Sequence, residues 1–296
     1  MWCYRVLSTV LLALVLALLA AIAEGCSSGG GDRHRPIVLL TDFGADDYRV
    51  PSLKGAILKA DPEARIVDGT HGVPAFDVAT GAYLLQVVSR SFPTNSVFIG
   101  VIAPGSPKRH LAVTTRKDQV FLVPDNGLLT YVARDAGIKS IRDVTNETLL
   151  GGSLGNLPVN QVLGTAGALV ASGTDPRDLG AEVTDPAYLD VPEARVEGGK
   201  LAGAIVYIDR FGNSVTNIEA DMVKQSGLAS GQRVEIQTPG GKVSGIFGTG
   251  YGDVPQGQVV VFVDSLGVLE LAINLRSFAA ANGVKAGTPV TVRAEQ

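Results

Sequence analysis

Strand-like and helix-like patterns alternate in the first half of the chain, and this alternation constrains the fold most. The first apolar run, Ile37–Leu40, ends in the turn sequence TDFG at residues 41–44, and apolar residues at helical spacing follow, including Leu53 and Ile57. Short apolar runs bounded by turns are typical of buried strands. Because strands that alternate with helices form mostly parallel sheets, we predict an α/β domain with a Rossmann-like sheet.

The same patterns predict the other elements of this domain. Asp46 and Asp47 precede the first helical stretch, where a helix N-terminus favours acidic residues. The further predicted strands begin at Ile66–Val67, Ser96–Val101, Leu111–Thr115 and Gln119–Val123, and the further predicted helices are Phe76–Ser89 and Leu128–Ala136.

Beyond Pro192 the pattern changes to short apolar runs separated by Gly and Pro. These runs include Ala204–Ile208, Arg233–Ile236, Val259–Val263 and Val290–Val292. Such spacing predicts an all-β, barrel-like C-terminal domain. The predicted domains are therefore 37–190 and 191–296, with linker character over residues 187–198.

Composition narrows the possible partners. The 296 residues are 46% hydrophobic, which is enough for two ordered domains. The net charge of −4 and the absence of a Lys/Arg cluster interleaved with aromatic residues argue against nucleic acid as a partner.

The N-terminus has the pattern of an export signal. One cation in MWCYR precedes the apolar run Val6–Ala23, and the small Gly25 stands before Cys26. This arrangement resembles a bacterial lipoprotein cleavage site, so we predict a signal peptide at 1–26, lipid attachment at Cys26, a flexible tether at 27–36 and an extracytoplasmic, membrane-anchored protein. An ordinary signal peptide or an uncleaved membrane anchor is the alternative.

Cysteines and histidines are too few or too scattered for disulfides or metals. Cys3 lies within the predicted signal, so no intramolecular disulfide is expected in the mature protein. His34, His71 and His110 lack the spacing of metal ligands. We expect no metal and no other cofactor.

Asp42 is the first candidate for ligand binding. It stands at the predicted carboxyl end of the first strand, where open α/β sheets usually bind ligands. A carboxylate there can accept two hydrogen bonds from a ribose diol. A helix-capping turn is the alternative interpretation of the same residues.

Ordered sequence blocks give this region its context. They are LTDFGADDY at 40–48, KG at 54–55, IVDGTH at 66–71, FDV at 76–78, PG at 104–105, PDNGLL at 124–129, IDRFGN at 208–213, TNI at 216–218 and DSLG at 264–267. The set resembles the S-adenosylmethionine hydroxide adenosyltransferases, which are similar to the fluorinase and chlorinase enzymes. The resemblance covers residues 37–295.

The resemblance implies a role for residues of the N-terminal domain. Asp42 would bind the ribose, Asp47 would pair with the methionine ammonium, and Phe76 would stack near the ribose and adenine. The ligand implied is S-adenosylmethionine or a related adenosyl molecule, with no cofactor.

It also implies roles in the C-terminal domain. Asp209 and Ser265 would hold the amino acid end of the ligand, and Asn213 would bind an adenine edge. The family places its ligand between neighbouring subunits of a trimer, so the resemblance implies a homotrimer.

The chain departs from the family where water is handled. The family's Asp before the Pro-Gly pair is Ala103 here, and Pro158 lies in the LPVNQ segment where the family has a His. Arg109 matches the third group and is the candidate catalytic residue, in a loop one residue shorter than the family pattern. Ser106 lies where halogenases place a small hydroxyl residue.

Two histidines remain as candidate bases. His110 could replace the missing base, although we interpret it as solvent-exposed at a strand start. His71 is near the predicted site, or else is a core residue hydrogen-bonded to the backbone. The resulting hypotheses are hydrolysis of S-adenosylmethionine to adenosine and methionine, an exported binding protein without catalysis, and, third, a halide transferase.

Overall fold

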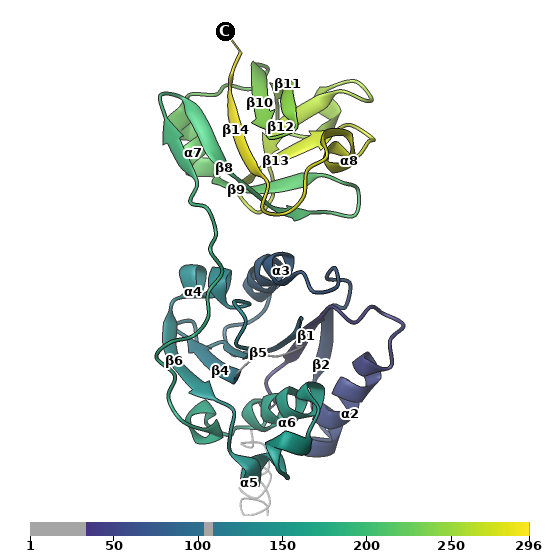
Figure 1. Ribbon diagram of the computed structural model, residues 1–296, viewed down its shortest axis with the longest axis vertical. Coiled ribbons are helices and arrows are strands. Elements are labelled where there is room, and N and C mark those ends of the chain that lie inside the picture. The colour runs from purple at the N-terminus through teal and green to yellow at the C-terminus, as the bar shows by residue number, and fades with distance from the viewer. Residues whose placement is uncertain (1–33, 104–108, 296) are drawn as a thin grey trace, which may run out of the picture. The chain divides into compact units, whose positions relative to one another are not determined.

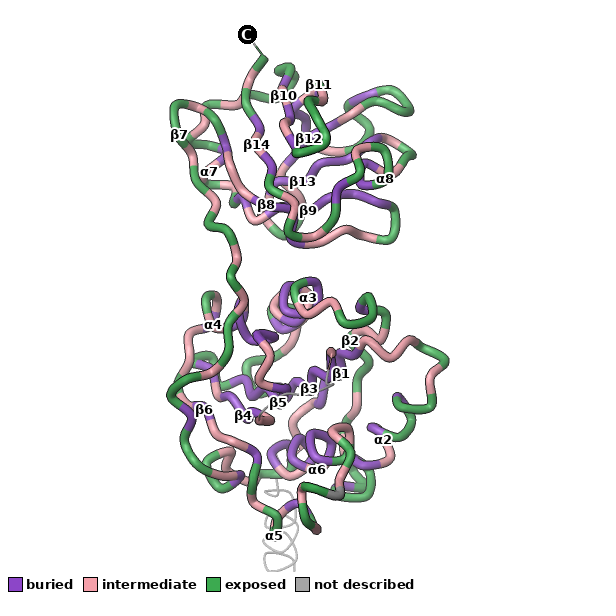
Figure 2. Tube along the Cα trace, in the orientation of Figure 1, coloured by how far each residue is buried: buried purple, intermediate pink, exposed green. Residues whose placement is uncertain are grey.

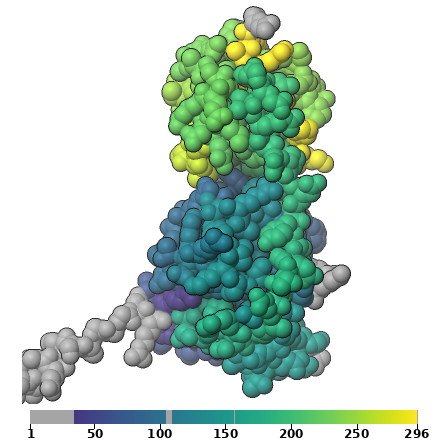
Figure 3. Space-filling view, turned by 90° about the vertical axis from the view of Figure 1, so that its left-hand side faces the viewer, coloured from purple at the N-terminus to yellow at the C-terminus, as the bar shows by residue number. Residues whose placement is uncertain are grey.

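The computed structural model describes residues 34–103 and 109–295, which contain an α/β domain followed by a closed β-barrel (Figure 1). The predicted fold class is therefore confirmed. Each domain comes from one continuous stretch of chain, and in Figure 3 the colours of the first run from purple through teal into green, whereas those of the second run from green to yellow. Cys26, Ser106 and the run Val6–Ala23 lie outside the described residues. None of the helices within the described ranges is long and apolar enough to cross a bilayer.

The α/β domain is built on a six-stranded sheet in the order β2-β1-β3-β5-β4-β6. Strands β2, β1, β3 and β5 are parallel neighbours, whereas β4 runs antiparallel to both β5 and β6. The strands are β1 (Ile37–Thr41), β2 (Ile66–Thr70), β3 (Val97–Val101), β4 (His110–Thr115), β5 (Val120–Pro124) and β6 (Ile138–Asp143).

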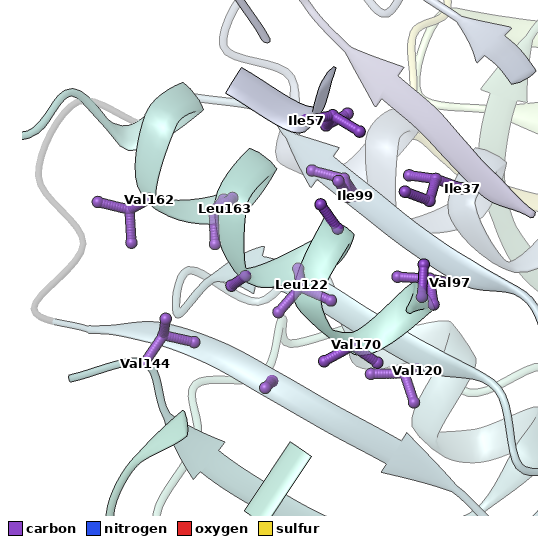
Figure 4. Packing of buried hydrophobic residues seen from close by; sticks show 14 of the residues in the cluster. Ile37, Ile57, Val97, Ile99, Val120, Leu122, Val144, Val162, Leu163 and Val170 are labelled. Carbon is purple, nitrogen blue, oxygen red and sulfur yellow. The ribbon is translucent and has the colours of Figure 1, made fainter. Parts of the chain in front are cut away.

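Helices cover both faces of this sheet. They are α2 (Arg49–Ala60), α3 (Val78–Arg90), α4 (Thr130–Ala136), α5 (Glu147–Leu150) and α6 (Val159–Ala171). Successive side chains of a strand point to opposite faces, so Ile37 and Leu39 of β1 pack in the cluster with α2 and α6, and Val38 and Leu40 pack with α3 and α4. Figure 2 shows the buried strands between the helices, and Figure 4 shows part of the first cluster.

Three of these strands and helices, β6, α5 and α6, were not predicted. Helix α6 has the sequence VNQVLGTAGALVA and is buried over most of its length, so it lacks the polar face by which an amphipathic helix is recognised. Its small residues allow close packing on the sheet. A Cβ atom at Gly167 would come within 2.5 Å of the Ile99 side chain, so glycine lets α6 approach β3.

The C-terminal domain is a barrel closed by the pairing of β14 with β8. The sheet order is β14-β10-β11-β12-β13-β9-β8-β7, and most of the buried apolar side chains of these strands form one cluster with α7 and α8. The elements are β7 (Arg195–Glu197), β8 (Lys200–Ile208), β9 (Ser214–Glu219), α7 (Ala220–Ser226), β10 (Arg233–Thr238), β11 (Gly241–Phe247), β12 (Val259–Val263), β13 (Val268–Ile273), α8 (Phe278–Asn282) and β14 (Pro289–Ala294).

The strand order creates a topological switch point between β1 and β3. From β1 the chain passes through α2 to β2 on one side, and it then returns through α3 to β3 on the other side. Helices that leave in opposite directions open a crevice at the carboxyl ends of such strands, which is where α/β sheets bind ligands. Thr41 pairs with Val101 at this edge, so Asp42 and Ala103 emerge close together.

Candidate ligand-binding site

Asp42 joins two loops at the switch point. Its Oδ2 accepts hydrogen bonds from the backbone N–H of Phe76 and of Ala103, each at 3.0 Å. None of the described residues donates a hydrogen bond to its Oδ1. One oxygen therefore organises the protein while the other is available to a ligand hydroxyl.

The two amide donors belong to residues with unusual backbone conformations. Phe76 has φ of 65° and Ala103 has φ of 44°, both in the left-handed region that non-glycine residues seldom adopt. Such conformations cost on the order of 1–3 kcal/mol each and cluster at functional sites. The Phe76 side chain is also 79% exposed, so a strained backbone presents an aromatic ring to solvent beside a carboxylate.

Asp47 lies in the turn that leads into α2. Its carboxylate accepts from the backbone N–H of Arg49 and forms an ion pair with the Arg49 guanidinium, both at 2.8 Å. The guanidinium also lies over the Tyr48 ring. A ligand ammonium at Asp47 would therefore share this carboxylate with Arg49.

Arg109 is held by two carboxylates. It contacts Asp125 at 2.7 Å and Asp185 at 2.7 Å, and it also donates to the Asp185 carbonyl. Hydrogen bonds to Asp185 and Asp125 raise the pKa of its guanidinium, which keeps it charged. Asn126, which follows Asp125 in the turn after β5, donates to the Ile102 carbonyl at 2.9 Å. This turn therefore supports the loop that carries Ala103.

The two remaining positions of the water-handling set carry no ionisable group. Ala103 contributes only its amide to Asp42, and Pro158 precedes the first residue of α6 at the helix surface. The structure therefore places no acid or base at either of these two positions, as the sequence predicts.

His110 is partly buried, so its interpretation as a solvent-exposed histidine is wrong. Its Nδ1 is buried and has no hydrogen-bond partner among the described residues. Burial lowers the pKa of His110, although the nearby Asp143 opposes this shift. The imidazole is therefore neutral at pH 7 and can accept a proton.

His71 lies beside the switch point, with its side chain only 9% exposed. Its ring nitrogens contact the side chains of Thr41 and Asp68 rather than the backbone. The alternative of a histidine bonded to the backbone through its ring is therefore not what the structure shows.

Asp209 organises the β8–β9 turn of the barrel. Its Oδ1 accepts from the backbone N–H of Phe211 and of Asn213, each at 2.9 Å, and its Oδ2 accepts from the Asn213 side chain. Gly212 has φ of 84°, and a Cβ atom there would clash with Ser277. The Phe211 side chain is 73% exposed, which gives this turn an aromatic ring beside a carboxylate.

The β12–β13 turn repeats this geometry around Asp264. Its Oδ1 accepts from the backbone N–H of Leu266 and of Val268, two and four residues further along. The predicted ligand residue Ser265 is exposed in this turn. Both turns share the sequence pattern D-x-Φ-G, in which Φ is apolar, and this pattern is the signal in the sequence that relates them.

The exposed Tyr251 and the buried Glu270 form a hydrogen-bonded pair in the barrel that sequence reasoning missed. The Tyr251 hydroxyl donates to Glu270 at 2.7 Å and lies 3.3 Å from the Asn213 amide nitrogen. Burial raises the pKa of Glu270; the Tyr251 hydrogen bond opposes the rise, whereas Asp264 and Asp209 add to it. None of the ion pairs among described residues involves these three acids, so this part of the barrel favours a cationic ligand.

Residues 37–180 match the family description SAM hydroxide adenosyltransferase N-terminal domain, and residues 203–291 match the corresponding C-terminal domain. The chain belongs to the SAM hydroxide adenosyltransferase family. Within this family, it is 30% identical to an (R)-S-adenosyl-L-methionine hydrolase from Thermus thermophilus, over 86% of this chain and 98% of that protein.

Other members of the SAM hydroxide adenosyltransferase family and a solved structure extend the comparison. A fluorinase from an Actinoplanes species is 26% identical to this chain, over 86% of this chain and 96% of the fluorinase. The crystal structure of an uncharacterized conserved protein from Thermotoga maritima superimposes with a TM-score of 0.81 at 28% identity, over 87% of this chain and 99% of that one. The chain thus covers both domains of its relatives, and the family processes S-adenosylmethionine.

The described residues include no group of three His, Cys, Asp or Glu side chains that could hold a metal ion.

Proposed function

We propose that this protein hydrolyses S-adenosyl-L-methionine to adenosine and L-methionine. The observation that carries the proposal is the Asp42 carboxylate, which is fixed at the switch point by the amides of Phe76 and Ala103. Its Oδ1 would bind the ribose hydroxyls while the exposed Phe76 ring covers the sugar. Membership of the family supports this ligand.

The reaction needs little chemistry from the protein because a sulfonium is already a good leaving group. The oxygen of water forms a bond to the ribose C5′ as the C5′–S bond breaks. The sulfur keeps the bonding electron pair and becomes the methionine thioether, and the attacking water loses a proton. The protein must hold the three atoms in line and limit the access of other water.

Water activation is the weak step in this chain. Ala103 and Pro158 stand where the family has an acid and a base, and Arg109 is engaged by Asp125 and Asp185. His110 keeps a neutral imidazole and is the remaining candidate base. We therefore expect slow turnover with ligand binding intact.

The test is chromatography of adenosine and methionine after the full chain is incubated with S-adenosylmethionine. We expect both products in equal amounts. An Ala103→Asp variant should form them faster by about tenfold or more, because general acid–base catalysis contributes about 10²–10⁴-fold. Aspartate also tolerates the left-handed backbone at this position better than alanine.

The matched control is Ala229→Asp, which adds the same charge at an exposed position of the barrel. It should leave the rate unchanged. If neither the natural chain nor Ala103→Asp forms products, hydrolysis is excluded.

An exported binding protein for S-adenosylmethionine or adenosine is the second candidate. It is favoured by the loss of the two water-handling groups while the carboxylates remain in place. Calorimetric titration that shows binding without product formation would select it. Titrations without heat for either ligand would exclude both candidates.

We also propose that the site is completed in a homotrimer, with the Asp42 half from one subunit and the Asp209 half from the next. Neither Asp42→Ala nor Asp209→Ala alone should bind ligand well. When the two variants are co-expressed and assemble randomly, roughly a quarter of the sites should contain both an intact Asp42 and an intact Asp209. The reason is that the two subunits that form a site are incorporated independently. No recovery of binding would show that the halves do not come from different subunits.

Finally, we propose that Cys26 carries a lipid and anchors an extracytoplasmic protein to the membrane. The expected result is that Cys26→Ala releases the protein from the membrane fraction and that the mass of the mature natural protein begins at a lipidated Cys26. A mature protein that begins at another residue would favour an ordinary signal peptide. A protein that still begins at Met1 would favour an uncleaved membrane anchor.

A further inference from the structure

A chain of polar side chains joins the end of β1 to helix α2, next to Asp42. Thr41 Oγ1 lies 2.9 Å from His71 Nδ1, and His71 Nε2 lies 3.1 Å from Asp68 Oδ1. Lys54 Nζ contacts the other oxygen of Asp68 at 2.7 Å. The chain therefore connects β1, β2 and α2 through His71, which follows β2 directly.

The hydrogen bonds determine which ring nitrogen of His71 carries the proton. Partial burial acts to raise the pKa of Asp68, but hydrogen bonds from Lys54 and His71 outweigh it and hold that pKa below its usual range. Asp68 is thus a carboxylate that can only accept, so Nε2 must be protonated. The Thr41 oxygen accepts from the backbone N–H of Phe43 at 3.3 Å, which leaves its hydroxyl proton to be donated to Nδ1 of His71.

Backbone contacts of the same segment surround Asp42. The His71 carbonyl accepts from Gly44 N–H at 2.8 Å, and the Thr41 carbonyl accepts from Val73 N–H at 3.4 Å. The loop that begins at His71 reaches Phe76, whose N–H donates to Asp42. His71 thus holds the start of this loop, and Asp42 holds its end.

We infer that His71 is a positioning residue: held as the Nε2–H tautomer by Asp68 and Lys54, it sets the direction of the Asp42 carboxylate and the Phe76 ring. Both ring nitrogens are engaged, so His71 does not serve as the base for water. The benefit for ligand binding rests on the proposed adenosyl ligand, whereas the effect on Phe76 can be observed without any ligand.

The decisive variant is Asp68→Asn in the full chain. It keeps the shape of the side chain but removes the charge that favours Nε2–H and binds Lys54. Asp68 is half-exposed, so folding should persist. The matched control is Asp118→Asn, which breaks a similar exposed pair with Lys139 at the β4–β5 turn and retains a residue type suited to the left-handed backbone there.

Two ligand-free NMR signals report on the positioning. With only three histidines in the chain, ¹⁵N-histidine labelling resolves the tautomer of His71, which His71→Gln identifies. Labelling of the nine phenylalanines with ¹⁵N gives the amide of Phe76, which Phe76→Leu identifies. Calorimetry with adenosine supplies the affinity.

In the natural chain we expect His71 to carry its proton on Nε2 and none on Nδ1. Asp68→Asn should change the tautomer signal, shift the Phe76 amide and weaken adenosine binding about five- to tenfold, which is the effect expected for one hydrogen bond. Asp118→Asn should change none of the three.

A natural chain with protonated Nδ1, or an unmoved Phe76 amide in Asp68→Asn, would overturn the positioning role. Unchanged adenosine affinity in that variant would overturn its benefit for ligand binding. If the natural chain binds no adenosyl ligand, the proposed function fails, and the Phe76 amide still decides whether His71 positions this loop.

Discussion

Asp42 of the α/β domain and Asp209 of the barrel each hold an exposed phenylalanine through its backbone amide. The partners of Asp42 lie 34 and 61 residues away along the chain. Those of Asp209 lie two and four residues away. The first half-site therefore exists only after the sheet has formed, whereas a short local sequence defines the second.

The difference has consequences for robustness. In the barrel the turn residues satisfy one another, and Gly212 supplies the positive φ that the turn requires. At the switch point of the α/β domain two non-glycine residues, Phe76 and Ala103, adopt positive φ, and the Asp42 carboxylate accepts from the amides of both. Removing Asp42 should therefore disturb more of the molecule than removing Asp209.

The largest effect is expected for Asp42→Ala. It leaves the amides of Phe76 and Ala103 without their acceptor and should lower the free energy of unfolding by about 2–3 kcal/mol. Adenosine affinity should fall by a similar free energy, because the ribose loses its carboxylate. Urea unfolding and calorimetry measure the two effects, and an unchanged affinity would refute the ribose role.

A smaller effect is expected for Asp209→Ala. The turn keeps Gly212 and its backbone hydrogen bond to residue 209, so the unfolding free energy should fall by about 1–2 kcal/mol. Amide exchange should increase only around residues 209–213. Faster amide exchange in the α/β domain as well would contradict the conclusion that Asp209 stabilises only its own turn.

Phe211→Ala should separate binding from stability. The ring is 73% exposed, so the unfolding free energy should change by less than about 0.5 kcal/mol. An aromatic contact to an adenosyl ligand should be worth about 1 kcal/mol, or roughly fivefold in affinity. Equal affinities for the variant and the natural chain would remove Phe211 from the site. Leu275→Ala, at an equally exposed apolar residue, is the control.

The smallest effect is a pH dependence at Glu270. Its pKa is raised in the folded state, so its contribution to stability is present below the unfolded pKa and is lost as pH rises through the folded pKa. Glu270→Gln should thus match the natural chain near pH 4 and be the more stable near pH 8. Urea unfolding at both pH values measures this difference.

The control for that experiment is Glu235→Gln. Hydrogen bonds from Lys242 and Arg293 lower the pKa of Glu235. Its contribution is present above the unfolded pKa and is lost as pH falls, so this variant should lose a little stability near pH 8. If both variants changed the free energy of unfolding near pH 8 in the same direction, the environments assigned to Glu270 and Glu235 would be wrong.

Much of the fold could be predicted because its signals are local. The run Ile37–Leu40 predicted β1, and Asp77 predicted the start of α3, where its side chain accepts from Thr80 N–H. Helix α6 was missed because burial around most of its surface removes the periodic signal. His110 was misjudged because burial of a strand end depends on its neighbours in the sheet.

Within the candidate site, the residue types came from the sequence and their partners from the fold. The blocks TDFG, IDRFGN and DSLG identified Asp42, Asp209 and the turn that carries Ser265. The engagement of Arg109 by Asp125 and Asp185, and that of Glu270 by Tyr251, involved residues 16 to 76 positions apart. No local pattern encodes such pairs.

The sequence by itself determined the two-domain α/β and barrel architecture, the family and the self-contained turns at Asp209 and Asp264. Only the tertiary structure decided that Asp42 would gather Phe76 and Ala103, and that His71 would connect Thr41 to Asp68. The physical reason is range: turn and strand preferences act over a few residues, whereas hydrogen bonds across a switch point require strands distant in sequence to be packed side by side first.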